Sequence, residues 1–189
     1  MAMESSGESI RLRLMTRADI PFGMRLEGAA GWNPTADARG AFLRLRPGGA
    51  FVAEIAGRPV GTVTTVDYEG GFGWVGMVLV EPEVRRRGVG TRLLAAGIES
   101  LAGCGAVRLD ATAEGRELYL RLGFHDEYGL SRQVRSAGSV PPPPALPGGR
   151  HAARDADLAA IAAVDAPAFG KPRRPALDPS RGPPRRPRS

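Results

Sequence analysis

The spacing of apolar positions divides the N-terminal part of the chain into one strand and two helices. From Ile10 to Met15, apolar and basic residues alternate, which predicts a half-buried strand. Two short helices are expected after it, over residues 18–29 and 35–45. The segment Gly31-Trp32-Asn33-Pro34 separates the helices, and Pro34 suits a first helical turn.

Three strands are expected in the middle of the chain. Residues 51–56 and 60–66 are rich in β-branched side chains, and Gly57-Arg58-Pro59 joins them, which predicts a hairpin. Residues 74–80 follow with the sequence WVGMVLV. This apolar run is uninterrupted and too short for a helix of its own. We therefore expect it in the middle of the sheet, covered on both faces.

The remaining pattern alternates between helices and strands. From Gly90 the apolar residues recur at helical spacing until Gly103 and Gly105 end the pattern. A short strand over 107–109, a helix over 114–122 capped by Gly123, and a last strand over 128–134 complete the series. The fold class is therefore α/β (mixed α+β), with a meander in the middle and no regular βαβ array.

Composition changes abruptly after residue 136. We expect one folded domain over residues 1–136, because 42% hydrophobic content suffices for a single core. A Pro/Gly-rich linker is expected over 137–149, a helical fragment over 150–170, and a disordered basic tail over 171–189.

Charge resides in the tail. The chain carries +6 overall, and residues 171–189 alone hold one Lys, six Arg and one Asp, which is also +6. Residues 1–170 are neutral, so the high isoelectric point gives no reason to expect nucleic-acid binding by the folded part.

The sequence also restricts redox chemistry, metal binding and location. Cys104 is the only cysteine, which excludes an intrachain disulfide or a cysteine-based metal cluster, and no metal is expected. No signal peptide and no membrane-spanning run are visible. We therefore expect a soluble cytoplasmic protein, and the sequence leaves open whether it forms a homodimer.

The segment VLVEPEVRRRGVGTRLL has the features of an anion site. A buried strand ends, Pro82 turns the chain, and a basic Gly-containing loop opens a helix. The first N–H groups of a helix lack carbonyl partners and lie at the positive end of the helix dipole. Backbone amides from Arg86 to Thr91 could therefore hold a pyrophosphate, with Arg85, Arg86 and Arg87 adding positive charge. Glycines at 88 and 90 are expected to let the backbone approach the phosphates.

A dinucleotide-binding loop is the competing interpretation. Asp110 lies about twenty residues past the glycines, where a ribose-binding acid is expected. The third glycine of that fingerprint would fall at position 93, which is Leu93. A bulky side chain there opposes close helix–strand packing, so this interpretation is disfavoured.

Two spaced motifs resemble the GNAT acetyltransferase superfamily. Arg85-Arg86-Arg87-Gly88-Val89-Gly90 is similar to its R/Q-x-x-G-x-G/A signature, and residues 118–124, LYLRLGF, resemble its downstream LY-x-x-x-GF segment. The resemblance covers roughly residues 10–135. Residues 30–33, 74–80 and 108–112 resemble a bacterial subgroup whose members often carry a second acetyltransferase-like domain.

The resemblance implies a GNAT-type fold with a central, mostly antiparallel mixed sheet flanked by helices. It also implies acetyl-CoA as co-substrate, bound by Val78, Leu79, Val80, Arg85, Arg86, Arg87, Gly88, Val89, Gly90, Thr91 and Thr112. A backbone N–H on the strand 78–80 would polarise the thioester carbonyl.

Catalytic and acceptor residues also follow from the resemblance. Tyr119 matches the family's general acid, which protonates the departing thiolate. Simple packing against Leu122 is the alternative for this ring. Trp32 and Asn33 lie where the superfamily contacts its acceptors, and core packing is the alternative for Trp32.

Several positions depart from the family pattern. Thr112 stands where Asn is common and Gly115 where Ala is common. The strand 74–80 has no carboxylate, so a general base would be Glu54, Asp67 or Glu69 acting through water, or the amine would arrive neutral.

The expected function is N-acetyl transfer from acetyl-CoA to an amine of a small molecule or protein. A non-catalytic acyl-CoA sensor with the same fold is the alternative.

The C-terminal fragment echoes the N-terminus. Residues 154–158, RDADL, resemble residues 16–20, TRADI, which suggests the start of a second copy of the fold. A truncated second domain is the preferred interpretation. The alternative is a basic tail that binds nucleic acid or acidic partners.

Overall fold

The computed structural model describes residues 9–32, 36–69, 71–131, 133 and 153–177. Two compact units make up the chain: one comprises Met1–Leu109 with Asp155–Ser189, and the other Asp110–Arg154. No helix of the described residues is long and apolar enough to cross a membrane.

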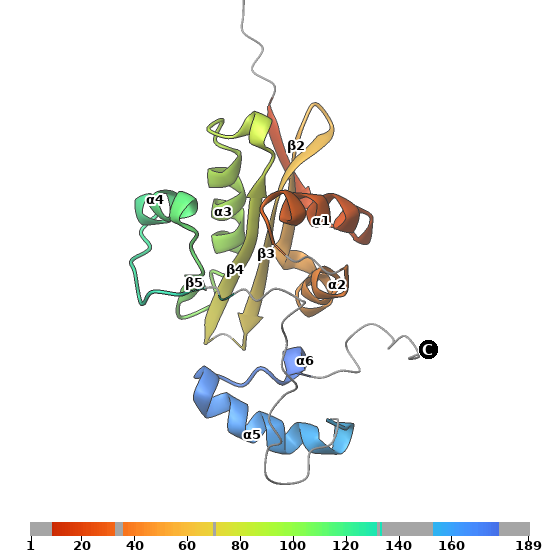
Figure 1. The fold of residues 1–189 in the computed structure, drawn as a ribbon, viewed down its shortest axis with the longest axis vertical. Coiled ribbons are helices and arrows are strands. Elements are labelled where there is room, and N and C mark those ends of the chain that lie inside the picture. The colour runs from red at the N-terminus through yellow and green to blue at the C-terminus, as the bar shows by residue number, and fades with distance from the viewer. Residues whose placement is uncertain (1–8, 33–35, 70, 132, 134–152, 178–189) are drawn as a thin grey trace, which may run out of the picture. The chain divides into compact units, whose positions relative to one another are not determined.

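The first unit contains a sheet flanked by helices (Figure 1). Its strands are β1 (Ile10–Leu14), β2 (Ala50–Ile55), β3 (Arg58–Tyr68), β4 (Phe72–Val80) and β5 (Val107–Leu109). Its helices are η1 (Arg17–Asp19), α1 (Ile20–Ala29), α2 (Ala36–Leu45), η2 (Pro47–Gly49), η3 (Pro82–Val84), α3 (Val89–Ser100), η5 (Asp155–Asp157), α5 (Leu158–Phe169) and α6 (Arg174–Leu177). The second unit contains α4 (Ala113–Arg121).

The sheet is mixed and mostly antiparallel, as expected. Its order is β1-β2-β3-β4-β5, in which the first four strands are antiparallel neighbours and β5 is parallel to β4. The hairpin between β2 and β3 is tighter than the sequence suggested, because Ile55 pairs with Arg58. Ala56 and Gly57 form the turn with φ angles of 49° and 74°, as a two-residue type I′ turn requires.

Helix α3 packs on one face of the sheet, where glycines permit a close approach. A Cβ at Gly97 of α3 would lie 3.2 Å from a methyl of Val63, and one at Gly73 would lie 2.6 Å from Leu101. The odd-numbered residues of β3 thus face α3. Leu93 and Leu94 are fully buried in this layer.

The opposite face is covered by α1 and α2. Met15, Ala50 and Val52 form a buried cluster, and Leu43 of α2 packs against it. Val52 lies directly opposite Thr62 of β3, so both project from the same face of the sheet. The sheet is therefore buried between two helical layers, as its family of folds requires.

Strand β3, not β4, is the most deeply buried strand, which corrects the prediction for residues 74–80. β3 is buried from Val60 to Val66, whereas residues 76–80 of β4 are half-buried. The threonines of β3 tolerate burial because their hydroxyls donate to backbone carbonyls: Thr62 to Met77 at 3.0 Å and Thr65 to Gly49 at 2.8 Å.

The expected last strand over 128–134 does not form in the described part of that range. Residues 128–131 and 133 adopt neither helix nor strand, and residues 132 and 134 lie outside the described residues. Tyr128 and Leu130, the apolar positions behind the prediction, are 66% and 64% exposed. Without burial or a partner strand, the period-2 pattern has nothing to stabilise it.

The described part of the segment after the linker contains helices, and one of them, α6, lies in the tail that was expected to be disordered. The linker 137–149 lies outside the described residues, and so does residue 178 onward. α5 forms within the expected helical fragment, and its terminal Phe169 packs on the end of the β3–β4 hairpin. Its ring centroid lies 4.9 Å from that of Tyr68 and 5.4 Å from that of Phe72, and the Arg173 guanidinium stacks on it at 3.9 Å.

The sequence echo is repeated in local structure. η1 leads directly into α1, and η5 leads directly into α5, with Asp19 and Asp157 at matching positions before the two helices. Val164 of α5 then corresponds to Leu26 of α1. Leu26 is 3% exposed against the sheet, whereas Val164 is 75% exposed.

Candidate functional site

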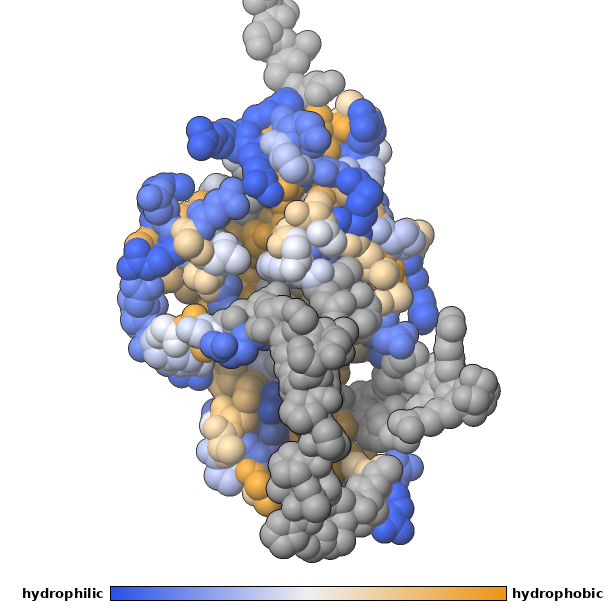
Figure 2. Space-filling view, viewed as in Figure 1, coloured by the Kyte–Doolittle hydropathy of each residue, from blue (hydrophilic) through white to orange (hydrophobic). Residues whose placement is uncertain are grey.

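The turn from β4 into α3 gathers exposed cations next to a helix N-terminus. After β4, the Val84 N–H donates to the Glu81 carbonyl at 3.1 Å, which closes the short helix η3. Arg85, Arg86 and Arg87 follow and are all exposed. In the view of Figure 1, the surface around this turn is mostly hydrophilic, with some hydrophobic residues among the polar ones (Figure 2). These three side chains therefore give a positively charged surface beside the first turn of α3.

Gly88 sets the geometry of the helix start. It is the N-cap of α3 with φ 82° and ψ 0°, a left-handed conformation that favours glycine. A Cβ at Gly88 would meet no atom within 4 Å, so the protein's own packing leaves its space open. The sequence predicts a glycine here because the backbone must approach a ligand. The structure shows a second requirement, the left-handed conformation of Gly88, which residue spacing does not reveal.

The helix N-terminus presents backbone donors. The first α-helical hydrogen bond of α3 runs from the Arg92 N–H to the Gly88 carbonyl at 3.1 Å. The N–H groups of Val89, Gly90 and Thr91 precede it and so have no acceptor within the helix. Together with the positive end of the helix dipole, they form a surface suited to a phosphate.

Close packing fixes this helix start against the sheet. Val89 is buried, and a Cβ at Gly61 of β3 would lie 2.9 Å from both the Leu79 carbonyl oxygen and the Leu93 side chain. The loop is therefore held by a rigid helix–strand contact, in which Gly61 is needed although no sequence motif singled it out.

A β-bulge distorts β4 just before the loop. Thr62 pairs with Leu79 and Thr64 with Gly76, so three steps along β4 match two along β3. Met77 takes up the extra residue with φ 53°, which is uncommon for a side chain of this size. No local sequence pattern indicates this bulge.

Beyond the bulge, β4 has an open edge. β5 pairs only with Gly73, Trp74 and Val75. Within the described residues, no strand pairs with Val78, Leu79 or Val80 on the side away from β3. Their backbone groups on that side can pair with an extended ligand in the manner of an added strand.

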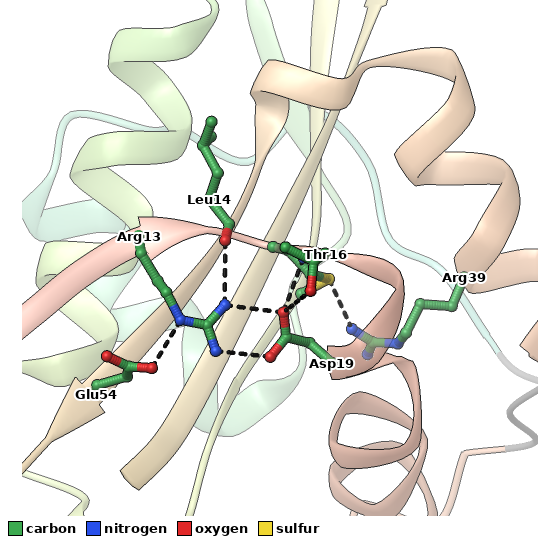
Figure 3. A network of polar contacts seen from close by, with 7 residues as sticks. Arg13, Leu14, Thr16, Asp19, Arg39 and Glu54 are labelled. Atoms are coloured by element: carbon green, nitrogen blue, oxygen red, sulfur yellow. Dashed lines mark hydrogen bonds and ion pairs between the residues drawn. The ribbon is translucent and has the colours of Figure 1, made fainter. Parts of the chain in front are cut away.

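The candidate bases are committed to other contacts or stand away from the loop. Glu54 lies on β2, two strands from β4, and accepts a hydrogen bond from Arg13 Nε at 2.7 Å (Figure 3). Asp67 pairs with Arg46 at 3.1 Å and lies opposite Gly73, at the other end of β4 from the loop. Glu69 is exposed beyond Asp67 on the same hairpin.

Glu81 is paired instead of solvated. It forms an ion pair with Arg25 of α1, and its side chain is 16% exposed. This contact ties α1 to the end of β4 and raises the pKa of Arg25. The two residues are 56 positions apart, so no local sequence pattern indicates this pairing.

Thr112 and Tyr119 lie on α4 in the second compact unit. Thr112 caps the helix, accepting a hydrogen bond from the Gly115 N–H at 3.2 Å. The Tyr119 ring lies edge-on to Phe124 with centroids 6.1 Å apart, and Gly115 leaves room for the ring on its other side. Burial raises the pKa of the Tyr119 phenol, which therefore stays protonated at neutral pH.

Trp32 follows the C-terminal end of α1. Its side chain is half-buried, and its backbone N–H donates to the Glu27 backbone carbonyl at 2.9 Å. Asn33 lies outside the described residues, as does Pro34. In the described parts of the chain, no group of three or more His, Cys, Asp or Glu side chains could hold a metal ion.

Comparison with known proteins places these elements in a family. The model of the acetyltransferase (GNAT) family matches residues 19–124, which include β4, the loop, α3 and α4. The chain is 30% identical over 147 residues to the uncharacterized N-acetyltransferase YitH of Bacillus subtilis, covering 78% of this chain and 51% of YitH. It therefore spans about half the length of this curated relative.

Solved structures share the fold. A putative acetyltransferase from Pyrococcus horikoshii has a TM-score of 0.67 at 21% identity, covering 94% of this chain and 63% of that protein. Glucosamine-6-phosphate N-acetyltransferase from Arabidopsis thaliana has a TM-score of 0.55 at 19% identity, covering 68% of this chain and 100% of that one. With the family model matching most of the chain, these observations lead to one conclusion: the chain belongs to the acetyltransferase (GNAT) family.

Proposed function

We propose that the chain transfers the acetyl group of acetyl-CoA to a primary amine of a small molecule or a protein. The observation that carries this proposal is the turn between β4 and α3. Three exposed arginines there adjoin a helix start whose N–H groups have no acceptor within the helix. A pyrophosphate that carries a further phosphate matches this arrangement of charge and donors.

The chain would bind the cofactor through the loop and the open edge of β4. Backbone N–H groups from Arg86 to Thr91 would bind the pyrophosphate, and Arg85, Arg86 and Arg87 would add charge. The open edge of Val78, Leu79 and Val80 would pair with the extended pantetheine amides. An N–H of that edge would polarise the thioester carbonyl, since a fixed dipole there stabilises the developing oxyanion. Thr112 is retained as a further cofactor contact.

Tyr119 would complete the reaction as a general acid. The amine attacks the thioester carbonyl carbon and its nitrogen loses a proton to water. The C–S bond then breaks and leaves a thiolate. The Tyr119 phenol would donate its proton to that sulfur. The raised pKa of Tyr119 supports this role, because the phenol is then protonated at the start of every turnover. Trp32 and Asn33 are proposed to contact the acceptor.

Three of the described carboxylates are held by arginines and are therefore poor candidates for the base. Glu54, Asp67 and Glu81 are each paired with an arginine. We therefore propose that the amine reaches the site already neutral or loses its proton to water. Turnover should then rise with pH until the free amine predominates, which favours acceptors whose amine pKa is low.

The test begins with cofactor choice. Acetyl-CoA, NAD and ATP are compared at saturating concentration by thermal unfolding, and only acetyl-CoA should stabilise the protein. Stabilisation by NAD alone would show that the dinucleotide interpretation was right. Amino acids, aminoglycosides, polyamines and peptide N-termini are then screened by CoA release. A folded protein that binds acetyl-CoA and acetylates none of them would instead support the sensor function.

The domain organisation proposed from the sequence is retained, with residues 150–170 as the start of a second copy of the fold. The repeated order of η1–α1 and η5–α5 supports it. The exposure of Val164 also supports it, because the corresponding Leu26 is buried. If this chain is joined to a complete second copy, Val164 should become buried. Thermal unfolding should then show that Val164→Asp destabilises the longer protein and not the present chain.

A further inference from the structure

A fully buried ion pair links the first two helices. The Arg39 side chain on α2 has no exposed surface, and Glu27 on α1 is 3% exposed. Arg39 Nη2 donates to Glu27 Oε1 at 2.5 Å. A second guanidinium nitrogen, Nη1, lies 3.9 Å from the Met15 sulfur, and Figure 3 shows the Arg39 side chain directed toward it.

The Arg39 side chain occupies the space where a side chain at position 23 of α1 would lie. A Cβ at Gly23 of α1 would lie 2.2 Å from Arg39 Cζ and 2.5 Å from Nε, so a side chain there would require Arg39 to move. Arg39 Nε has no hydrogen-bond partner among the residues that the structure describes. Burial lowers the pKa of Arg39, and Glu27 opposes that effect. Apolar side chains of similar volume would fill the site without the cost of removing two charges from water.

The ion pair nevertheless orients the end of α1 relative to α2 in a way that apolar packing would not. Glu27 makes two different contacts: its carboxylate binds Arg39, and its backbone carbonyl accepts the Trp32 N–H at 2.9 Å. The Gly31 N–H also donates to the Gly28 carbonyl at 3.0 Å, with Gly31 at φ 71°. A directional ion pair therefore sets the last turn of α1 relative to α2, and that turn holds Trp32.

We propose that the Glu27–Arg39 pair is a positioning device for Trp32 and, through it, for the acceptor amine. This inference rests on the proposed function, in which Trp32 contacts the acceptor. Neither Glu27 nor Arg39 would touch the substrate, since both are buried. Their effect on the reaction would be limited to acceptor binding, and the acetyl-CoA loop would not depend on them.

Trp32 itself provides the measurement. The chain has two tryptophans, so a Trp74→Phe background isolates the Trp32 fluorescence. The double variant Glu27→Leu/Arg39→Met replaces the ion pair with apolar side chains of similar volume. Quenching by acrylamide reports the accessibility of Trp32, and calorimetry reports acetyl-CoA affinity. The control is Arg173→Met/Asp165→Leu, which removes another ion pair, between α5 and the turn that follows it.

The double variant should remain folded and bind acetyl-CoA within about twofold of the parent. The quenching constant of Trp32 should rise about twofold or more, and the KM for an amine should rise about tenfold with little change in kcat. The control should change neither the quenching constant nor the amine KM. An unchanged Trp32 quenching constant in a folded double variant would overturn the proposal, whatever the acetylation assay gives.

The remaining outcomes separate this inference from the proposed function. A loosened Trp32 with an unchanged amine KM would overturn the link to the acceptor. Failure of the parent protein to acetylate any amine would count against the proposed function alone, because the fluorescence result stands without turnover. If the double variant does not fold, Glu27→Asp takes its place. It keeps the charge and withdraws the carboxylate by one methylene, so Trp32 quenching should rise to an intermediate value.

Discussion

A substitution at Gly88 tests whether the conformation of the loop, and not only its charge, holds the cofactor. Gly88 has φ 82°, and a Cβ there would meet no atom within 4 Å. Gly88→Ala therefore introduces no clash within the protein. Its cost is the left-handed conformation itself, about 1–2 kcal/mol for a residue with a Cβ.

The cost of the left-handed conformation can lower either the stability of the protein or its affinity for acetyl-CoA. If the loop keeps its shape, the whole cost of about 1–2 kcal/mol lowers the free energy of unfolding. If the loop relaxes to another conformation, the N–H groups of α3 lose their alignment, and acetyl-CoA must restore it on binding. The same 1–2 kcal/mol then weakens affinity about 5- to 30-fold. Gly88→Val should do so more strongly, because a β-branched residue is less tolerant of positive φ.

Gly57 provides a matched control. It has φ 74°, and a Cβ there would also meet nothing within 4 Å, but it lies in the β2–β3 turn. Gly57→Ala should lower stability by a similar amount and leave acetyl-CoA affinity unchanged. Gly88→Asn should recover part of the lost affinity, because Asn adopts the left-handed region more readily than Ala.

The assay is calorimetric titration with acetyl-CoA, with thermal unfolding of each variant measured in parallel. Tight binding by the parent is the precondition, and its absence would count against the cofactor assignment itself. With that precondition met, equal affinities for the parent, Gly88→Ala and Gly57→Ala would refute the reasoning. The phosphates would then be held without the conformation that Gly88 imposes.

Three further predictions concern separate parts of the molecule. Arg13 lowers the pKa of Asp19 from 3.8 to about 2. Asp19→Asn should therefore lower the free energy of unfolding by about 1–2 kcal/mol at pH 7. This is less than the full linkage value, because the Arg13 side chain is 31% exposed and solvent screens the pair. Measured by urea unfolding, the difference in the free energy of unfolding between the parent and Asp19→Asn should be complete above about pH 4 and vanish as the pH falls through about 2. A difference that does not change with pH would contradict this prediction. Phe169→Ala should speed hydrogen exchange in α5, whereas Val164→Ala, at a 75% exposed site, should not; equal effects would count against the aromatic contact. Tyr119→Phe should keep acetyl-CoA affinity and lower turnover by ~10²–10⁴, and normal turnover would exclude Tyr119 as the general acid.

Local patterns in the sequence determined most of the elements and the position of the loop. The order from β1 to α4 was predictable because each element has its own apolar period and its own end signals, such as Thr112 before α4 and Gly123 after it. The loop was predictable for the same reason. A strand, a turn, clustered arginines and a helix start are adjacent in the chain, so their chemistry needs no long-range contact.

Tertiary structure decided what depends on residues far apart in sequence. Pattern alone favoured the apolar run 74–80 as the covered strand, yet β3 is buried more deeply because its threonine hydroxyls find carbonyl acceptors on neighbouring elements. The bulge at Met77 exists only through the register of β4 against β3. The buried Glu27–Arg39 pair joins two helices, and neither helix's own sequence indicates that these two charges meet. Pairing and burial are properties of the assembled sheet and helices, and a one-dimensional period does not encode them.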